Sequence, residues 1–262
     1  MFPLIQSNEM RFNCFNQNKS IFRCEKCNLI QLLPQWTDLE LEELYKKYGS
    51  KEDFTKSKRK IKISKYLLKY TNPKESCFEI GCGAGDNIKF LNDNERNAIG
   101  IDKDSTISNP NIVNSDLFEY ETESKFDFIY SIHSLEHFTD PKKMLSWISN
   151  HLKENGSFLI EVPNVEEPLL SVYKIKEFEK FYWYPYHLFF FSPNTITSLL
   201  SNFNLKIKRI QTYGIWNHLR WIFFKIPHNI NPTIPIIDPI YKFILTKILK
   251  KSDTLLVIGR KQ

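Results

Sequence analysis

Three glycines at alternate positions, Gly81, Gly83 and Gly85, directly follow a short and mainly apolar run at 77–80. Such a run predicts a β-strand. Glycines at the end of a strand allow the backbone to turn sharply and to approach a ligand without Cβ atoms in between. This arrangement is typical of sites that bind a nucleoside-containing cofactor. The loop is therefore the feature that most restricts the fold and the chemistry of this chain.

The spacing of these glycines separates two classes of cofactor site. Dinucleotide-binding enzymes carry Gly-x-Gly-x-x-Gly, and the start of the next helix is then clear to hold a pyrophosphate. Here the spacing is Gly-x-Gly-x-Gly, and Asp86 follows the third glycine. Because a carboxylate near a helix start repels phosphate, the loop is better suited to the zwitterionic end of an amino acid.

A second acid strengthens this interpretation. Asp102 closes the apolar run at 98–101, about 20 residues after the first glycine, where a carboxylate can accept hydrogen bonds from ribose hydroxyls. The alternative is a turn residue at the end of a strand. Further strands are predicted at 112–117, 126–131 and 157–164, with a helix that starts at Asp140-Pro141. This alternation predicts a parallel, doubly wound α/β sheet with the ligand over the carboxyl ends of its strands.

In this order the motifs resemble those of the class I S-adenosylmethionine-dependent methyltransferases. The resemblance rests on the acid-x-Gly-x-Gly-x-Gly run from Glu79, on the acid that ends the second strand, and on the Leu-Glu-His segment at 135–137. It implies a seven-stranded, mostly parallel, Rossmann-like sheet whose last strands are 205–213 and 254–260. It also implies S-adenosylmethionine as the cofactor.

The resemblance assigns roles to individual positions. The methionine end of the cofactor would contact Glu79, Gly81, Gly83 and Gly85. The ribose would contact Asp102, and the adenine would contact Asp116 and Leu117. The glycines and Asp102 are also supported by the reasoning from residue types, whereas the adenine contacts rest on the family alone.

The chain is divided into a small N-terminal module at 1–50 and a methyltransferase domain at 54–262, with a lid at 165–191 and an insertion at 215–251. Cys24 and Cys27 form a Cys-x-x-Cys knuckle, and Cys14 is the one other cysteine before Cys77. The module resembles a degenerate zinc ribbon of the sugar C-methyltransferase-like and ubiquinone-biosynthesis-like branch. Since a zinc site needs four ligands, we expect no metal ion and no bound zinc.

Two histidines are candidates for a general base. A hydroxyl or a carbon acceptor must lose a proton during methyl transfer, and histidine is the usual base near neutral pH. His187 lies in an aromatic segment at 178–191, which we interpret as a substrate lid, with a core segment as the alternative. His133 follows the predicted fourth strand and is the second candidate.

Composition fits a cytoplasmic enzyme. The chain has 262 residues and a net charge of +6, and its N-terminus shows no secretory signal pattern. We expect a small-molecule acceptor, such as a sugar or a glycan precursor, and no nucleic acid. Aromatic residues and lysines at 215–251 suggest peripheral membrane contact, with core coverage or a dimer interface as alternatives. The competing functions are a nicotinamide-dependent oxidoreductase and a noncatalytic S-adenosylmethionine-binding module.

Overall fold

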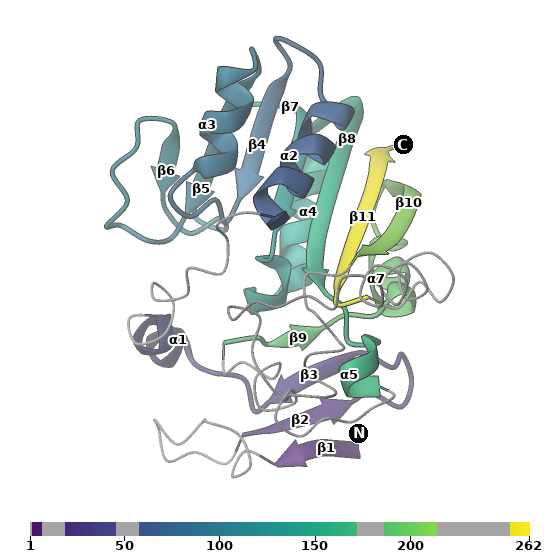
Figure 1. The fold of residues 1–262 in the computed structure, drawn as a ribbon. Coiled ribbons are helices and arrows are strands. Elements are labelled where there is room, and N and C mark those ends of the chain that lie inside the picture. Colours follow the sequence, from purple (N-terminus) through teal and green to yellow (C-terminus); the bar gives the residue numbers. More distant parts are fainter. Residues whose placement is uncertain (1, 7–18, 46–57, 172–185, 214–251) are drawn as a thin grey trace. The chain divides into compact units, whose positions relative to one another are not determined.

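The computed structural model of the protein describes residues 2–6, 19–45, 58–171, 186–213 and 252–262 (Figure 1). The chain forms two compact units, each built from separate stretches of sequence. The first unit comprises 1–54, 163–195 and 211–255, and the second comprises 55–162, 196–210 and 256–262. Among the described residues, no helix is long and apolar enough to cross a membrane.

The first unit contains a four-stranded sheet in the order β1-β2-β3-β9. Its elements are β1 (Phe2–Gln6), β2 (Ser20–Arg23), β3 (Ile30–Leu33), α1 (Asp38–Leu44), α5 (Pro168–Ser171) and β9 (Phe189–Phe190). The turn between β2 and β3 carries the Cys-x-x-Cys pair, and both sulfurs are free thiols. Helix α1 starts at a capping box, in which the Thr37 hydroxyl accepts from the Glu40 N–H and the Glu40 carboxylate accepts from the Thr37 N–H.

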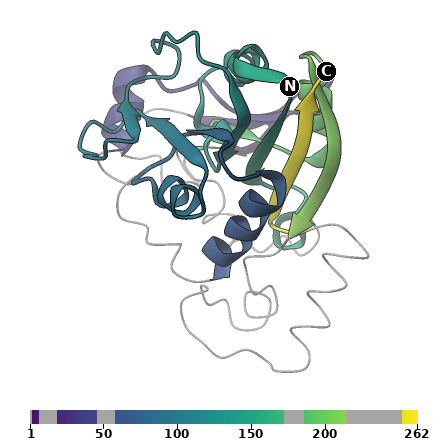
Figure 2. The ribbon, with the colours of Figure 1, turned by 90° about the horizontal axis from the view of Figure 1, so that it is seen from above.

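The second sheet has seven strands in the order β10-β11-β8-β7-β4-β5-β6. Its strands are β4 (Ser76–Ile80), β5 (Asn97–Asp102), β6 (Ile112–Asn114), β7 (Phe126–Ile132), β8 (Leu152–Pro163), β10 (Leu205–Tyr213) and β11 (Thr254–Lys261). The accompanying helices are α2 (Lys58–Tyr70), α3 (Asp86–Asp93), the 3-10 helix η3 (Leu135–His137), α4 (Pro141–His151) and α7 (Pro193–Leu200). Figure 2 shows β10 and β11 side by side at one edge of this sheet.

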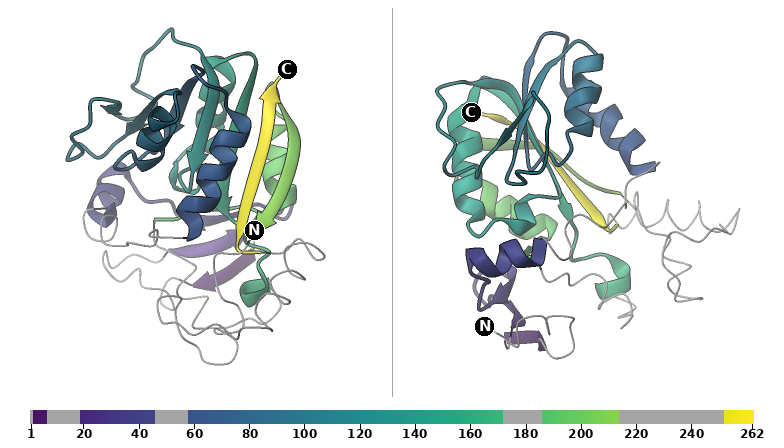
Figure 3. Two further views of the ribbon diagram at one scale, coloured as in Figure 1. Left: turned by 45° about the horizontal axis from the view of Figure 1, so that its top comes forward. Right: turned by 90° about the vertical axis from the view of Figure 1, so that its left-hand side faces the viewer.

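Five consecutive strands run parallel, from β6 at one edge through β5, β4 and β7 to β8. Helices α2 and α3 cover one face of the sheet and α4 covers the other, as the right-hand view of Figure 3 shows. Both faces are therefore shielded, and the strand interiors are apolar, with Phe78, Phe128 and Phe158 fully buried. The predicted doubly wound sheet is confirmed.

The boundary between α4 and β8 differs from the sequence prediction. Helix α4 starts as expected, with the Asp140 carboxylate capping the N–H groups of Lys142 and Lys143. However, it ends at His151, and β8 begins at the next residue. The register against β7 then jumps from Leu152 to Ser157, so residues 153–156 form a bulge. The regular part of β8 starts at the predicted position.

Parts of the predicted lid and insertion lie outside the described residues. This applies to all of 215–251 and to 172–185 within the lid. Of the aromatic segment, residues 186–191 are described, and Leu188 to Phe191 among them are all buried. The segment pairs with β3 through β9, so these four side chains pack as a core segment, which is the alternative that the sequence left open for them.

Candidate functional site

The glycine loop directly follows β4 and has the backbone conformation that its residues predict. Gly81, Gly83 and Gly85 have φ values of 70°, 51° and 81°. L-residues with side chains adopt this left-handed region only at a cost. The Gly81 N–H donates to the Ile101 carbonyl at 2.9 Å, which holds the loop against the end of β5.

The space around the loop differs from one glycine to the next. A Cβ atom at Gly81 would lie 2.2 Å from the hydroxyl oxygen of Ser134, so this position is closed. A Cβ atom at Gly83 would meet no atom within 4 Å. Gly83 therefore exposes backbone to open space, as a loop that contacts a ligand closely requires.

Asp102 lies at the end of β5 and is tied to the same loop. Its carboxylate accepts hydrogen bonds from the Gly83 N–H at 2.7 Å and from the Asp104 N–H at 3.0 Å, one on each oxygen. Each oxygen has two acceptor positions, so one position on each remains beyond these two bonds. The structure thus brings together two of the predicted cofactor-binding positions.

Glu79 is a carboxylic acid in the interior of β4, only 1% exposed. Its two oxygens accept hydrogen bonds from the Asn87 amide at 2.7 Å and from the Tyr130 hydroxyl at 3.2 Å. Burial disfavours the charged form and raises the pKa of Glu79 to about 8, although the two hydrogen bonds act in the opposite direction. Glu79 is therefore largely protonated at neutral pH.

This pKa predicts a pH-dependent stability. Because the pKa of Glu79 is about 8 in the folded protein and 4.5 for a free side chain, the folded state retains a proton that the unfolded state has lost. The free energy of unfolding should then fall as the pH rises from about 4.5 to 8, by up to ~1.4 kcal/mol per pH unit. Urea denaturation across this range would measure it. Glu79→Gln should flatten the slope, whereas Glu119→Gln, at an exposed position, should not.

The predicted adenine residues follow β6. The Asp116 carboxylate accepts from the N–H of Phe118 at 2.8 Å and lies 3.5 Å from the Lys103 ammonium. Lys103 directly follows Asp102, so the ends of β5 and β6 come together. Leu117 is buried and lines one side of a hollow of about 530 Å³ that reaches Trp147 and His151 of α4. No other predicted cofactor residue lines this hollow.

His133 follows β7 and occupies a constrained position. Its φ is 51°, which is unusual for a residue with a side chain, and its N–H donates to the Glu161 carbonyl at 2.8 Å. Its ring nitrogens lie close to two carboxylates. Nδ1 is 3.3 Å from Glu136, and Nε2 is 3.1 Å from Glu161.

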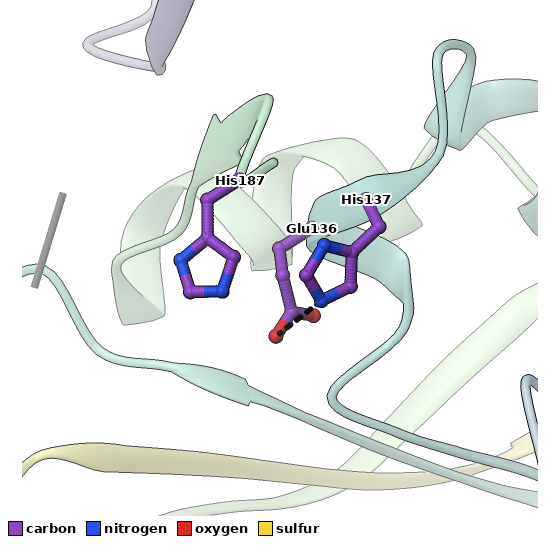
Figure 4. Close-up of side chains that lie close together, drawn as sticks. All are labelled: Glu136, His137 and His187. Carbon is purple, nitrogen blue, oxygen red and sulfur yellow. Dashed lines mark ion pairs between the residues drawn. The ribbon is translucent and has the colours of Figure 1, made fainter. Parts of the chain in front are cut away.

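Glu136 also contacts a second histidine. The Nε2 atom of His137 lies 3.9 Å from the Glu136 carboxylate, and Figure 4 shows this pair. The backbone N–H of His137 donates to the Ser134 carbonyl, as a turn residue would. Ser134 in turn donates its hydroxyl to the Gly81 carbonyl at 3.3 Å. The segment after β7 is thereby connected to the glycine loop.

His187 belongs to the first unit, where it precedes β9. Its ring lies near those of Tyr186 and Phe190, with centroid distances of 5.5 Å and 6.1 Å. The neighbouring Tyr186 stacks on Tyr45 at the end of α1. This part of the predicted lid thus has an aromatic environment.

Reasoning from sequence missed Glu136 and Glu161 as site residues. Both are almost completely buried, at 1% and 0% exposure. The signal for Glu161 was its place between Ile160 and Val162 in an otherwise apolar strand, because a charged residue there needs a partner. Glu136 has a weaker signal, since it belongs to a short segment whose burial only the fold reveals.

The chain matches the family model described as a methyltransferase domain over residues 54–210, which is more than half of its length. No curated protein sequence matches it significantly. The family match agrees with the order of the motifs. It does not support the interpretation as a nicotinamide-dependent oxidoreductase.

Many solved structures share the fold. A methyltransferase from Archaeoglobus fulgidus, titled as S-adenosylmethionine-dependent, is 20% identical, with a TM-score of 0.56 over 78% of this chain and 93% of that one. An N1-methyltransferase from Burkholderia thailandensis that acts on 1,6-didemethyltoxoflavin, solved with S-adenosylhomocysteine, is 12% identical, with a TM-score of 0.58 over 93% and 96%. An N-methyltransferase from Bradyrhizobium japonicum is 14% identical, with a TM-score of 0.52 over 84% and 97%. The chain therefore belongs to the methyltransferase domain family and is a class I S-adenosylmethionine-dependent methyltransferase.

Proposed function

We propose that this enzyme transfers a methyl group to a small-molecule acceptor, with a sugar or a glycan precursor as the acceptor class, and that it acts in the cytoplasm. The proposal for the donor site is carried by one observation. The strand-end carboxylate of Asp102 is hydrogen-bonded to the glycine loop at Gly83, where the backbone faces open space. The sugar class is supported by the resemblance of the N-terminal module alone.

The order of the strands supports a position for each part of the cofactor. The parallel strands β6, β5, β4 and β7 are neighbours in that order, so their carboxyl ends meet at one edge of the sheet. Along this edge we place the adenine at Asp116 and Leu117, the ribose at Asp102, and the methionine end at the glycine loop. The acceptor would then lie beyond the ends of β7 and β8.

The residues of the loop have distinct tasks in this arrangement. Gly83 allows the backbone to approach the methionine end, while Gly81 and Gly85 allow the close packing of Ser134 and Ile112. Glu79, in the strand before the loop, would hold the loop in shape by accepting a hydrogen bond from Asn87 at the start of α3. A buried carboxyl here also provides a negative charge, once ionised, for the positive charges of the cofactor.

The chemistry needs alignment more than it needs reacting groups. When bound, S-adenosylmethionine supplies a methyl group on a positively charged sulfur, and the sulfur becomes neutral when this group leaves. The protein has to hold the acceptor in line with the methyl carbon and to exclude water. It needs a base only where the acceptor atom carries a proton that must be lost.

His187 is our first candidate for this base, and His133 is the second catalytic candidate. His187→Ala should lower the methyl transfer rate by about 100-fold to 10,000-fold, the usual contribution of a general base. Single-turnover measurement with saturating cofactor would report the chemical step. The matched control is His151→Gln, because the His151 ring contacts only the backbone carbonyls of Trp147 and Thr122 among the described hydrogen bonds. An unchanged single-turnover rate in His187→Ala would exclude His187 as the base.

The acceptor class can be tested directly. The protein would be incubated with methyl-labelled S-adenosylmethionine and a panel of nucleotide-linked sugars, free sugars and small amines. Transfer of label to a nucleotide-linked sugar supports the proposal, and fragmentation of the product locates the methyl group on oxygen, nitrogen or carbon. Transfer to amines alone would contradict the sugar class while leaving the donor site intact. Formation of no S-adenosylhomocysteine with any acceptor would favour a noncatalytic module.

The branch within the family also remains a proposal. Cys24 and Cys27 lie at a turn between two strands, as in a zinc knuckle, and Cys14 lies outside the described residues. We expect the purified protein to contain no stoichiometric zinc. The membrane contact proposed for 215–251 and the division into domains at residues 50 and 54 likewise stay predictions.

A further inference from the structure

One imidazole lies between two buried carboxylates at the end of β7. The carboxylates of Glu136 and Glu161 are 1% and 0% exposed, whereas the His133 side chain is 23% exposed. Each carboxylate approaches a different ring nitrogen of His133, at 3.3 Å and 3.1 Å. The three groups come from three segments in one compact unit, namely η3, β8 and the turn after β7.

With both carboxylates ionised, the two contacts favour one protonation state of the ring. A neutral imidazole has one N–H group and one lone pair, and a lone pair that faces a carboxylate is repelled. An imidazolium has an N–H on both nitrogens and can face a carboxylate with each. A positive ring also lowers the net charge of the cluster from −2 to −1. This matters because isolated buried charges are costly.

The backbone holds His133 in place independently of its side chain. A left-handed φ is strained for a non-glycine residue and persists only where the surroundings fix it. Here the His133 N–H is fixed by the Glu161 carbonyl. Glu161 therefore contacts His133 twice, once through its backbone and once through its carboxylate.

We propose that Glu136 and Glu161 are positioning residues that hold His133 as a fixed imidazolium, and that His133 acts as a permanent charge beside the methyl-transfer site and not as its general base. The inference rests on the proposed function, because it assumes that the acceptor lies beyond the ends of β7 and β8. It also leaves His187 as the candidate base.

Other charged groups near the cluster fit this assignment. His137, on η3, shares the Glu136 carboxylate at 3.9 Å. Strand β4 pairs with β7 and carries the carboxyl group of Glu79. The oxygens of Glu79 accept hydrogen bonds from Asn87 and Tyr130. Within the described contacts, Glu136 and Glu161 are the carboxylates that lie within 4 Å of the His133 ring.

Spectroscopy of the histidine ring would test the charge itself. In protein with ¹⁵N-labelled histidine, we expect both His133 nitrogens to remain protonated up to at least pH 8, well above the ordinary value of ~6.5. Glu161→Gln and Glu136→Gln should each make the ring lose its proton at least one pH unit lower, since a charge at this distance shifts titration by about 1–3 units. His133→Asn assigns the signals.

The matched control is Glu154→Gln, which removes an exposed carboxylate of β8 that pairs with Lys261. It should leave the His133 titration unchanged. A His133 ring that is neutral at pH 7, or that titrates identically in both glutamine variants and the parent, would overturn the proposal. Backbone spectra of each variant at pH 7 would verify that the fold is retained, and Glu136→Gln provides the test if Glu161→Gln does not fold.

Kinetics separate this inference from the proposed function. With an active acceptor, the pH at which the rate falls on the acidic side should be the same in the parent and in Glu161→Gln, although the maximal rate drops. If His133 were the base, this pH would move with the titration of the ring. Because the spectroscopic measurement needs no acceptor, it stands even if no methyl transfer is found.

Discussion

Asp102→Ala is expected to bind S-adenosylmethionine about 100-fold or more weakly than the parent protein. The substitution would remove two acceptor positions for the ribose hydroxyls, and a hydrogen bond to a charged group contributes about 1.5–3 kcal/mol. A loss of ~1.4 kcal/mol weakens binding tenfold. It would also remove the acceptor for the Gly83 N–H, so that the glycine loop loses one of its three hydrogen bonds to β5, the other two being donated by Gly81 and Cys82 to the Ile101 carbonyl.

Isothermal titration calorimetry with S-adenosylmethionine and with S-adenosylhomocysteine would measure this effect. Asp93→Ala is the control, since it removes an exposed carboxylate of α3 that pairs with Lys89. This variant should bind both ligands like the parent. Asp102→Asn should fall between the two, because its amide oxygen still accepts a bond while the charge is lost. Parent-like affinity in Asp102→Ala would mean that Asp102 is only a turn residue at the end of a strand.

The central sheet was predictable because each of its strands has a local signal. The apolar runs at 98–101 and 126–131 each end at polar residues, and parallel strands that are buried on both faces consist almost entirely of such runs. The glycine loop was predictable for the same reason, since the left-handed φ values of Gly81, Gly83 and Gly85 are a local requirement. Periodicity and turn residues act over short distances and can be read from one sequence.

The contacts of the candidate site depend on distances in space that the sequence does not contain. Glu136 and Glu161 are far apart in the chain, and they meet at His133 only because β7 and β8 are parallel neighbours. The pairing of β9 with β3 joins segments that are further apart still. The sequence offered Glu161 as an unusual residue in an apolar strand, but it could not name its partner.

The second large effect is expected on stability, from two glycine-to-alanine substitutions in the glycine loop. The new methyl groups would have different surroundings. Gly81→Ala should destabilise the fold by about 2–5 kcal/mol, because the new Cβ would lie 2.2 Å from the Ser134 hydroxyl oxygen at a φ of 70°. Gly83 has a similar φ of 51°, but the new Cβ atom of Gly83→Ala would meet no atom within 4 Å. Its cost to the fold should be restricted to about 1–2 kcal/mol of backbone strain.

Cofactor affinity should rank the same two variants in a different way. If the methionine end of the cofactor occupies the open space at Gly83, then Gly83→Ala should weaken S-adenosylmethionine binding at least tenfold in a protein that is still folded. Urea denaturation and calorimetry on the same samples would report stability and affinity separately. Adding Ser134→Gly to Gly81→Ala should restore much of the lost stability, because it removes the side chain that the new Cβ would meet.

The two measurements together locate the ligand relative to the loop. Parent-like affinity in Gly83→Ala would mean that no ligand approaches the backbone at this point, and the assignment of the methionine end to the loop would be wrong even if Asp102 binds the ribose. Equal destabilisation of both variants would instead show that the left-handed backbone, and not the packing against Ser134, sets the requirement for glycine. Glycine would then be required at both positions by the left-handed φ alone.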